Sequence, residues 1–163
     1  MVNRTLINLP IIFFTVCFSV SNMGVWAAEN TRTIEEHKVI DVINQAEAYI
    51  QQYGKAKAIE KFKMNSSMIF AIDFNGNVLA SPLHPETVNT NQINFKDFTG
   101  LLAVKEEIDK AKAGGGWLKG RYRKNNITDQ YECRRLYILP MKGNYFIGSW
   151  YHYTPNKDDK CSI

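Results

Sequence analysis

Residues 67–80 read Ser-Met-Ile-Phe-Ala-Ile-Asp-Phe-Asn-Gly-Asn-Val-Leu-Ala. Two mainly apolar runs, residues 67–72 and 77–80, flank the dipeptide Asn75-Gly76. Asn-Gly readily adopts the positive φ angles that a tight hairpin turn requires. Short apolar runs bounded by turn residues are typical of β-strands. This stretch therefore predicts a β-hairpin.

A long amphipathic helix is expected before the hairpin. Thr33 is followed three residues later by Glu36, a capping-box pattern that predicts the helix start. Gly54 is expected to end the helix, and one or two further helical turns are expected over residues 56–62. Apolar residues recur between these ends at alternating spacings of four and three, as on one helix face: Val39, Ile43, Ala46, Ile50 and Tyr53.

A long loop, a second helix and three more strands are expected after the hairpin. Residues 81–96 contain two prolines and several Asn and Thr residues, and a loop of this length often covers a site. The second helix ends at Gly114-Gly115-Gly116. Its apolar stripe consists of Leu101, Val104, Ile108 and Ala111. The expected strands cover residues 117–123, 131–139 and 145–153.

This order of elements, α-β-β-α-β-β-β, predicts an α+β fold. We expect a five-stranded antiparallel sheet with the long N-terminal helix packed on one face. The length after residue 27 suits one domain of ordinary size, so residues 28–163 are interpreted as a single domain.

The first 27 residues have the layout of a secretory signal peptide. Arg4 is the only charged residue before Glu29, and the apolar core at residues 11–20 is shorter than a spanning helix requires. Small residues at Val25 and Ala27 favour cleavage after Ala27, which places the domain in the periplasm or outside the cell. The alternative is an uncleaved segment that anchors the domain in the inner membrane.

Charge and spacing argue against several classes of function. After cleavage the chain keeps 20 − 1 = 19 basic against 16 acidic residues, dispersed along the sequence, which does not favour nucleic acid. The three histidines are scattered singly, without metal-ligand spacing, and no haem-attachment motif occurs. A thiol nucleophile would have to pair Cys133 with His84 or His152, which no local motif brings together. We therefore expect a non-catalytic protein without a metal or other cofactor.

Two cysteines, Cys133 and Cys161, remain after cleavage. An oxidising compartment would allow them to form a disulfide, worth about 3 to 4 kcal/mol in the chain-entropy model. The alternative is a buried free thiol at Cys133 and an unpaired thiol in the C-terminal tail.

Four segments together resemble the single Cache domain, the extracellular relative of the PAS fold. Residues 72–82 are similar to the family's Asp-x-Asn-Gly hairpin that ends in a proline. Residues 96–100 resemble the Asp-x-x-Gly before its second helix, residues 114–118 its glycine-rich entry to the third strand, and residues 134–140 its fourth strand. The resemblance covers about residues 33–153 and implies a PAS/Cache-like fold. Two departures, Gly120 in place of an aromatic and Trp150 in place of a glycine, indicate a reshaped pocket.

The resemblance implies an exported sensor domain for a small polar or carboxylate metabolite, bound on the sheet face opposite the long helix. A sensor domain without its own membrane helix would act through a separate partner, a membrane receptor or a transporter. The alternative is a non-catalytic protein–protein interaction module with a degenerate Cache pocket.

Strand alternation suggests which residues would contact such a ligand. A register that pairs Tyr122 with Tyr131, and Gly120 with Cys133, puts four polar or aromatic side chains on one face, with Gly120 leaving room beside them. Arginine can hold a carboxylate by two hydrogen bonds, and tyrosine gives an apolar wall with a polar tip. The alternative for this face is ordinary cross-strand packing. The candidate ligand-binding residues are Tyr122, Tyr131, Arg135 and Tyr137, with Arg121 retained for a shifted register and His84 as a residue of the covering loop.

The signal-peptide interpretation is tested by N-terminal sequencing of the protein exported from a bacterial host. Cleavage predicts a chain that begins at Ala28 in the periplasmic or secreted fraction. A chain that keeps its first 27 residues and remains in the membrane fraction would support the anchor instead.

Overall fold

The computed structural model describes residues 23–64, 66–125, 128–155 and 161, with side chains from residue 32 onward. Most of the predicted signal peptide, residues 1–22, lies outside the described residues. In the described part of the chain, no helix is long and apolar enough to cross a membrane. The elements are α1 (Met23–Tyr53), α2 (Lys55–Phe62), β1 (Phe70–Asp73), β2 (Val78–Ala80), a 3-10 turn η2 (Pro85–Thr87), α3 (Ala103–Lys112), β3 (Gly116–Trp117), β4 (Arg121–Lys124), β5 (Tyr131–Met141) and β6 (Tyr145–Tyr153).

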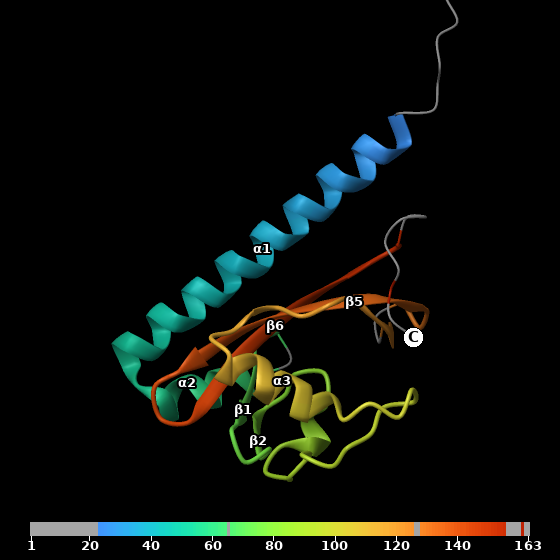
Figure 1. The fold of residues 1–163 in the computed structure, drawn as a ribbon. Helices are drawn as coiled ribbons and strands as arrows, with labels where there is room; N and C mark the ends of the chain where they lie inside the picture. The colour runs from blue at the N-terminus through green and yellow to red at the C-terminus, as the bar shows by residue number, and fades with distance from the viewer. Residues whose placement is uncertain (1–22, 65, 126–127, 156–160, 162–163) are drawn as a thin grey trace, which may run out of the picture.

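These strands form one antiparallel sheet, as the sequence predicts. Its order is β2-β1-β6-β5-β3, and β4 also pairs with β5. Helix α1 runs along one face of the sheet, while α3 and the loop that follows β2 lie on the other (Figure 1). The predicted α+β fold with a long N-terminal helix on one face is confirmed.

The α1 face of the sheet holds one of two apolar cores. Ile43 and Ala46 of α1 pack with Ala58 and Phe62 of α2 and with sheet residues such as Ile147. Helix α1 ends where Gly54 takes a φ of 80°, which allows α2 to fold back beneath it. The predicted stripe is therefore correct in its centre. Its last member, Tyr53, is exposed, because it lies beyond the packed turns.

The second apolar core lies between the sheet and α3. Val104, Ile108 and Ala111 of α3 are buried against sheet residues that include Phe70 and Trp150. These three positions recur at the spacing expected for one helix face, as the sequence predicts. The glycines at residues 114–116 follow the helix with positive φ angles and bring the chain into β3.

The hairpin of β1 and β2 is confirmed, and the carboxylate of Asp73 organises its turn. Asp73 Oδ1 accepts hydrogen bonds from the backbone N–H groups of Asn75 and Asn77, each at 2.9 Å. Gly76 takes a φ of 91°, and a Cβ there would lie 2.7 Å from Ile93 Cβ. The Asn-Gly turn is therefore required both by backbone angle and by the close approach of the following loop.

Two element boundaries differ from those expected. Helix α1 begins at Met23 rather than near Thr33, because residues 25–32 contain neither proline nor glycine and the helix simply continues through the capping-box pattern. The expected strand at residues 117–123 is divided into β3 and β4. Leu118 N still donates to Leu136 O at 2.9 Å, whereas Arg121 already pairs with Arg134.

The division between β3 and β4 is a β-bulge. From residue 118 to residue 121 the chain advances three positions while β5 advances only two, from 136 to 134. The extra residue near Lys119 and Gly120 reverses the alternation of faces. The predicted register was consequently wrong by two residues, since Tyr122 pairs with Cys133 and Lys124 with Tyr131.

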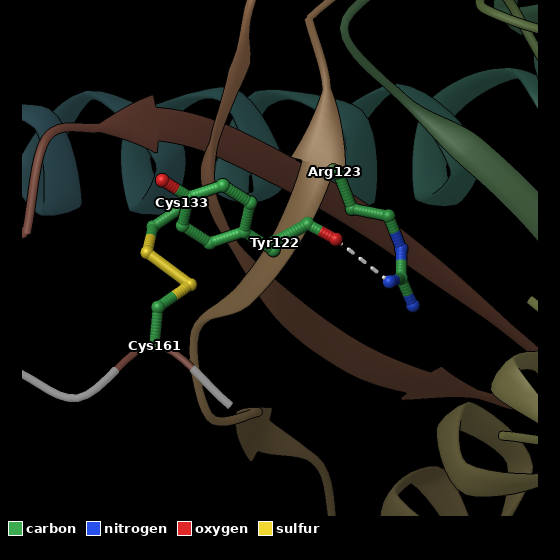
Figure 2. The surroundings of a disulfide bond; sticks show 4 residues. All are labelled: Tyr122, Arg123, Cys133 and Cys161. Carbon is green, nitrogen blue, oxygen red and sulfur yellow. Dashed lines mark hydrogen bonds between the residues drawn. A yellow bond between two sulfur atoms is a disulfide. The ribbon is translucent and has the colours of Figure 1, made fainter. Parts of the chain in front are cut away.

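A disulfide joins Cys133 of β5 to Cys161 (Figure 2). The Cα atoms are 6.0 Å apart, within the usual range for a disulfide. Figure 2 also shows the Tyr122 ring on the disulfide side of β4, whereas Arg123 extends the other way. The predicted pairing of these cysteines is confirmed, and it fastens the C-terminal tail to β5.

We expect reduction of the disulfide to lower the free energy of unfolding by about 3 kcal/mol, because the bond closes a long loop of the unfolded chain. Urea unfolding of the protein beginning at Ala28, with and without dithiothreitol, measures this difference. A Cys161→Ser variant should match the reduced protein and should not respond to dithiothreitol. Equal stability of oxidised and reduced wild type would show that the bond has no such role.

Candidate functional site

A cavity of about 420 Å³ lies on the sheet face opposite α1. Its floor is formed by strands, one wall by the first turns of α3, and its cover by the loop after β2. Eight of the lining residues come from the loop at residues 81–96, which the sequence predicts to cover a site. The lining residues are Phe70, Ile72, Val78, Ala80, Ser81, Pro82, Leu83, His84, Glu86, Thr87, Gln92, Phe95, Asp97, Phe98, Ala103, Val104, Glu107, Arg123, Lys124, Tyr131, Arg134 and Trp150.

Arg134 of β5 brings a positive charge to the floor of this cavity. Its Nε atom is buried without a hydrogen-bond partner, and no ion pair of its guanidinium occurs among the described residues. Burial lowers the pKa of Arg134 to about 10, and Glu107 opposes that shift. The side chain therefore stays cationic at neutral pH, with unused hydrogen-bond donors.

Glu107 of α3 brings a carboxyl group to the wall of the same cavity. Burial raises its pKa to about 7, with a further rise from Glu106 and opposing effects of Arg134 and Arg123. Like Arg134, it has no hydrogen bond or ion pair within the described part of the chain. Glu107 and Arg134 each shift the pKa of the other. Their N and O atoms are nevertheless more than 4.0 Å apart, so the two side chains form no ion pair.

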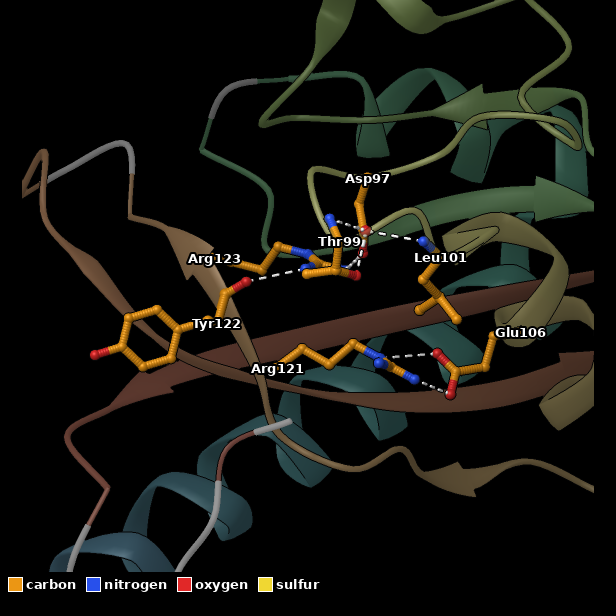
Figure 3. A network of polar contacts seen from close by, with 7 residues as sticks. All are labelled: Asp97, Thr99, Leu101, Glu106, Arg121, Tyr122 and Arg123. Atoms are coloured by element: carbon orange, nitrogen blue, oxygen red, sulfur yellow. Dashed lines mark hydrogen bonds and ion pairs between the residues drawn. The ribbon is translucent and has the colours of Figure 1, made fainter. Parts of the chain in front are cut away.

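The mouth of the cavity is fixed by a buried ion pair between Arg123 and Asp97 (Figure 3). Arg123 Nη2 donates to Asp97 Oδ2 at 2.6 Å, and only 14% and 6% of the two side chains is exposed. Asp97 Oδ1 also accepts from the backbone N–H groups of Thr99 and Leu101. Burial acts to raise the pKa of Asp97, but the hydrogen bonds from Thr99 and Leu101, with the charge of Arg123, hold it below its ordinary value. Asp97 thereby stabilises the turn before α3 through its backbone hydrogen bonds and connects that turn to β4 through Arg123.

Arg121 is placed by a second carboxylate, Glu106. Its Nε atom donates to Glu106 Oε2 at 3.0 Å, and its Nη2 atom donates to Glu106 Oε1. In Figure 3 the ring of Tyr122 points away from the side on which Arg121 and Arg123 extend. Arg121 therefore joins α3 to β4 and does not line the cavity.

The structure separates the residues that the sequence predicted to share a ligand face. Tyr131 and His84 line the cavity. Tyr122, Arg135 and Tyr137 do not, because alternation along β4 and β5 directs them to the α1 side of the sheet. The sequence correctly predicted that Tyr122, Arg135 and Tyr137 share one face of the sheet. The long helix α1, however, covers that face.

Arg135 has a structural partner on the α1 side. Its Nη1 atom donates to Glu36 Oε1, and Tyr151 Oη donates to the same oxygen at 3.1 Å. Arg135 Nε donates to Leu118 O at 3.3 Å, and the guanidinium lies 4.8 Å from the centroid of the Trp117 ring. Arg135 is thus engaged in holding α1 against β5 and β6.

The two departures from the family pattern lie on different faces. Trp150 lines the cavity. The space expected at Gly120 is not available to a ligand, because a Cβ there would lie 2.1 Å from the hydroxyl oxygen of Tyr153. Tyr153 pairs with Cys133 on the α1 side.

Sequence reasoning missed Arg134 and Glu107 as site residues. Glu107 lies three residues after Val104 and four before Ala111, so it lies on the same helix face as the buried stripe of α3. A carboxylate at such a position is a signal that could have been used. Nothing in the sequence distinguishes Arg134 from Arg135. Among the described residues, no three His, Cys, Asp or Glu side chains lie where they could hold a metal ion.

Comparison with protein-family models identifies one family. The family model described as "Cache domain" (dCache_2) matches residues 43–152. No curated protein matches the chain significantly.

Three solved structures share this fold at low sequence identity. A methyl-accepting chemotaxis protein from Vibrio parahaemolyticus is 15% identical, with a TM-score of 0.62 over 78% of this chain and 95% of its own. A periplasmic sensor domain of a chemotaxis protein is 13% identical, with a TM-score of 0.56 over 81% and 99%. A Cache chemosensory domain described for carboxylic acid recognition is 13% identical, with a TM-score of 0.54 over 81% and 98%.

We expect Asp97→Ala to lower the free energy of unfolding at pH 7 by about 3 kcal/mol, because it leaves Arg123 buried and unpaired. Asp109→Ala, which breaks the exposed pair with Lys105, should change it by less than about 0.5 kcal/mol. The pKa of Asp97 is lowered on folding, so its contribution is present above the ordinary aspartate value of 3.8 and is lost as the pH falls through the lower folded value. Urea titrations at pH 7 and in acid measure both effects. Equal losses in the two variants at pH 7 would contradict this role of Asp97.

Proposed function

The chain belongs to the Cache domain family, and from this we propose that it is an exported sensor domain that binds a small metabolite through a carboxylate. The observation that carries the proposal is the guanidinium of Arg134, which lines the cavity with its Nε atom buried and has no hydrogen-bond or ion-pair partner among the described residues. Leaving such a donor unsatisfied is costly, and a carboxylate satisfies it by two parallel hydrogen bonds.

The shape of the cavity supports a small ligand. Its volume of about 420 Å³ lies in the range of small-molecule sites. Its lining is mainly apolar and aromatic, with a few polar groups that can orient a bound molecule. The structurally similar domain described for carboxylic acid recognition supports the same class of ligand.

The loop over the cavity gives the ligand a cover. The backbone N–H of His84 donates to Ser81 Oγ at 3.2 Å, and its ring Nδ1 lies 3.2 Å from Glu86 Oε1. The exposed rings of Phe98 and Tyr131 meet edge to face at the mouth, with centroids 6.0 Å apart. We propose that His84 and Tyr131, both candidates from the sequence, contribute to this cover and mouth rather than to the anchoring of the carboxylate.

Signal transfer would require a partner. We propose that cleavage after Ala27 releases the domain into the periplasm or medium, where it acts through a membrane receptor or a transporter. We expect helix α1 to transmit ligand binding to the partner. The contacts of Glu36 connect α1 to β5 and β6, the strands that carry Arg134 and Trp150. An interaction module with a degenerate pocket is supported less well, since Trp150 lines the cavity without filling it.

Thermal-shift titration of the mature protein with acetate, propionate, pyruvate and succinate, together with alanine, leucine and phenylalanine, tests the proposal. At least one of these carboxylates should raise the melting temperature, and Arg134→Met should weaken its binding by about 30-fold or more, since a charge-assisted pair is lost. Lys124→Met removes a cation from the rim and should leave the affinity within about threefold.

The melting curve of Arg134→Met without ligand establishes that the variant is folded. A folded variant that binds as tightly as the wild type would overturn the assignment of Arg134. A wild type that no carboxylate stabilises would overturn the proposed ligand class.

A further inference from the structure

The net charge of the domain is concentrated at one corner, where α1 ends and α2 folds back beneath it (Figure 1). Residues 49–64, which we call the basic corner, contain four lysines and one glutamate, a net charge of 4 − 1 = +3. The rest of residues 28–163 contains 19 − 4 = 15 basic and 16 − 1 = 15 acidic residues, so its net charge is zero. The basic residues are dispersed along the sequence, but their excess over the acidic residues is confined to this corner.

Two lysines of α2 lie over the tyrosines that end α1. Lys61 Nζ is 4.0 Å from the centroid of the Tyr49 ring, and Lys57 Nζ is 4.6 Å from the centroid of the Tyr53 ring. The centroids of the two tyrosine rings are themselves 4.5 Å apart. The face of a ring attracts an ammonium group without occupying its N–H donors. Each lysine is therefore held at the surface with its donors available to a partner.

The protein itself does not neutralise these two charges. Lys57 and Lys61 are both exposed, and neither forms an ion pair or a hydrogen bond within the described part of the chain. Lys63, in the same corner, is paired instead with Glu60, with 2.7 Å between Nζ and Oε1. The basic corner thus offers unpaired positive charge to an anionic partner.

Exposed apolar side chains adjoin the lysines. Met64 is 62% exposed, Met68 is 45% exposed and Tyr53 is 44% exposed. Ser67 N donates to Met64 O at 2.9 Å, and because this bond turns the chain, Met68 stays close to the end of α2. Lysines beside exposed apolar and aromatic side chains are the combination by which proteins bind the surface of a membrane.

The use of lysine favours a membrane over a protein as the partner. The basic corner contains four lysines and no arginine. Protein–protein interfaces are enriched in arginine and depleted of lysine, because the planar guanidinium forms specific paired hydrogen bonds. Lysine is a compact, hydrated point charge, which suits the diffuse negative charge of anionic lipid headgroups.

We propose that the basic corner binds the surface of a membrane that contains anionic phospholipids. Lys57 and Lys61 contact the headgroup phosphates, and Tyr53, Met64 and Met68 enter the interface between headgroups and acyl chains. This surface is separate from the cavity, and its binding requires no ligand there.

The position of the corner agrees with a released domain. Helix α1 has 31 residues, so its end at Tyr53 lies about 45 Å from its start at Met23. An uncleaved anchor before Met23 would hold the basic corner away from the anchoring membrane. A domain released by cleavage after Ala27 can turn the corner toward a membrane.

Co-sedimentation of the protein beginning at Ala28 with lipid vesicles tests the proposal. Vesicles of phosphatidylglycerol and phosphatidylcholine in equal parts should bind it about tenfold or more tightly than vesicles of phosphatidylcholine alone. Added NaCl should remove most of this difference, because salt screens the attraction. The double variant Lys57→Gln/Lys61→Gln should lose about tenfold or more of the affinity for anionic vesicles. Glutamine keeps the helix propensity of lysine, so α2 should still form.

A matched control removes the same charge from the other face of the sheet. Lys105→Gln/Lys112→Gln changes two exposed lysines of α3 and should leave the affinity within about threefold, since these charges lie far from the corner. Lys112 Nζ also lies over a ring, 5.8 Å from the centroid of Phe74, so the control includes a comparable ring contact. Met64→Ser should weaken the binding that remains in NaCl, because it removes apolar surface from the interface.

Equal binding to the two kinds of vesicle, or equal losses in the α2 and α3 variants, would overturn the proposal. Melting curves establish that each variant is folded. A domain that stays in solution with both kinds of vesicle would also overturn it and would leave an acidic protein surface as the partner of this corner. These experiments contain no carboxylate ligand, so their outcome does not depend on the proposed sensor function.

Discussion

The structure depends on two consecutive arginines of one strand, which serve opposite faces of the sheet. Because side chains alternate across a strand, Arg134 and Arg135 of β5 must point to opposite faces of the sheet. Arg135 reaches Glu36 and holds the long helix α1. Arg134 faces the cavity, where it has no protein partner among the described residues. The same backbone segment thus supports the helix on one side and brings a guanidinium to the cavity on the other.

The remaining elements make this division of faces possible. The β-bulge near Gly120 reverses the alternation between β3 and β4, so that Trp117 packs on the α1 side while Arg121 and Arg123 reach α3 and its preceding loop. Asp97 then anchors that loop at the mouth of the cavity. In the proposed site, a ligand at Arg134 would be separated from the helix held by Arg135 only by the thickness of one sheet. A shift of β5 on ligand binding would therefore move Arg135 and change its contact with Glu36 of α1.

Much of the fold could be predicted because it depends on local signals. The Asn75-Gly76 turn, the apolar stripe of α3 and the last strand at residues 145–153 were predicted correctly, and the cysteine pairing is confirmed. The site was harder to predict for a physical reason. Tyrosine and arginine suit either face of a half-buried strand, so period-two alternation defines two faces without saying which one a helix covers. A single bulge residue then altered the register, and Glu107 entered the site only through the packing of α3 on β5.

The central claim is that the cavity at Arg134, and not the α1 face of the sheet, is the ligand site. A crystal structure of the mature protein with the compound that stabilises it most tests this directly. We expect the ligand carboxylate within hydrogen-bond distance of the Arg134 guanidinium, between β5 and α3, with the contacts of Arg135 and Glu36 still made. A ligand bound beside Tyr122, Arg135 and Tyr137 on the α1 face, with the cavity empty, would contradict it.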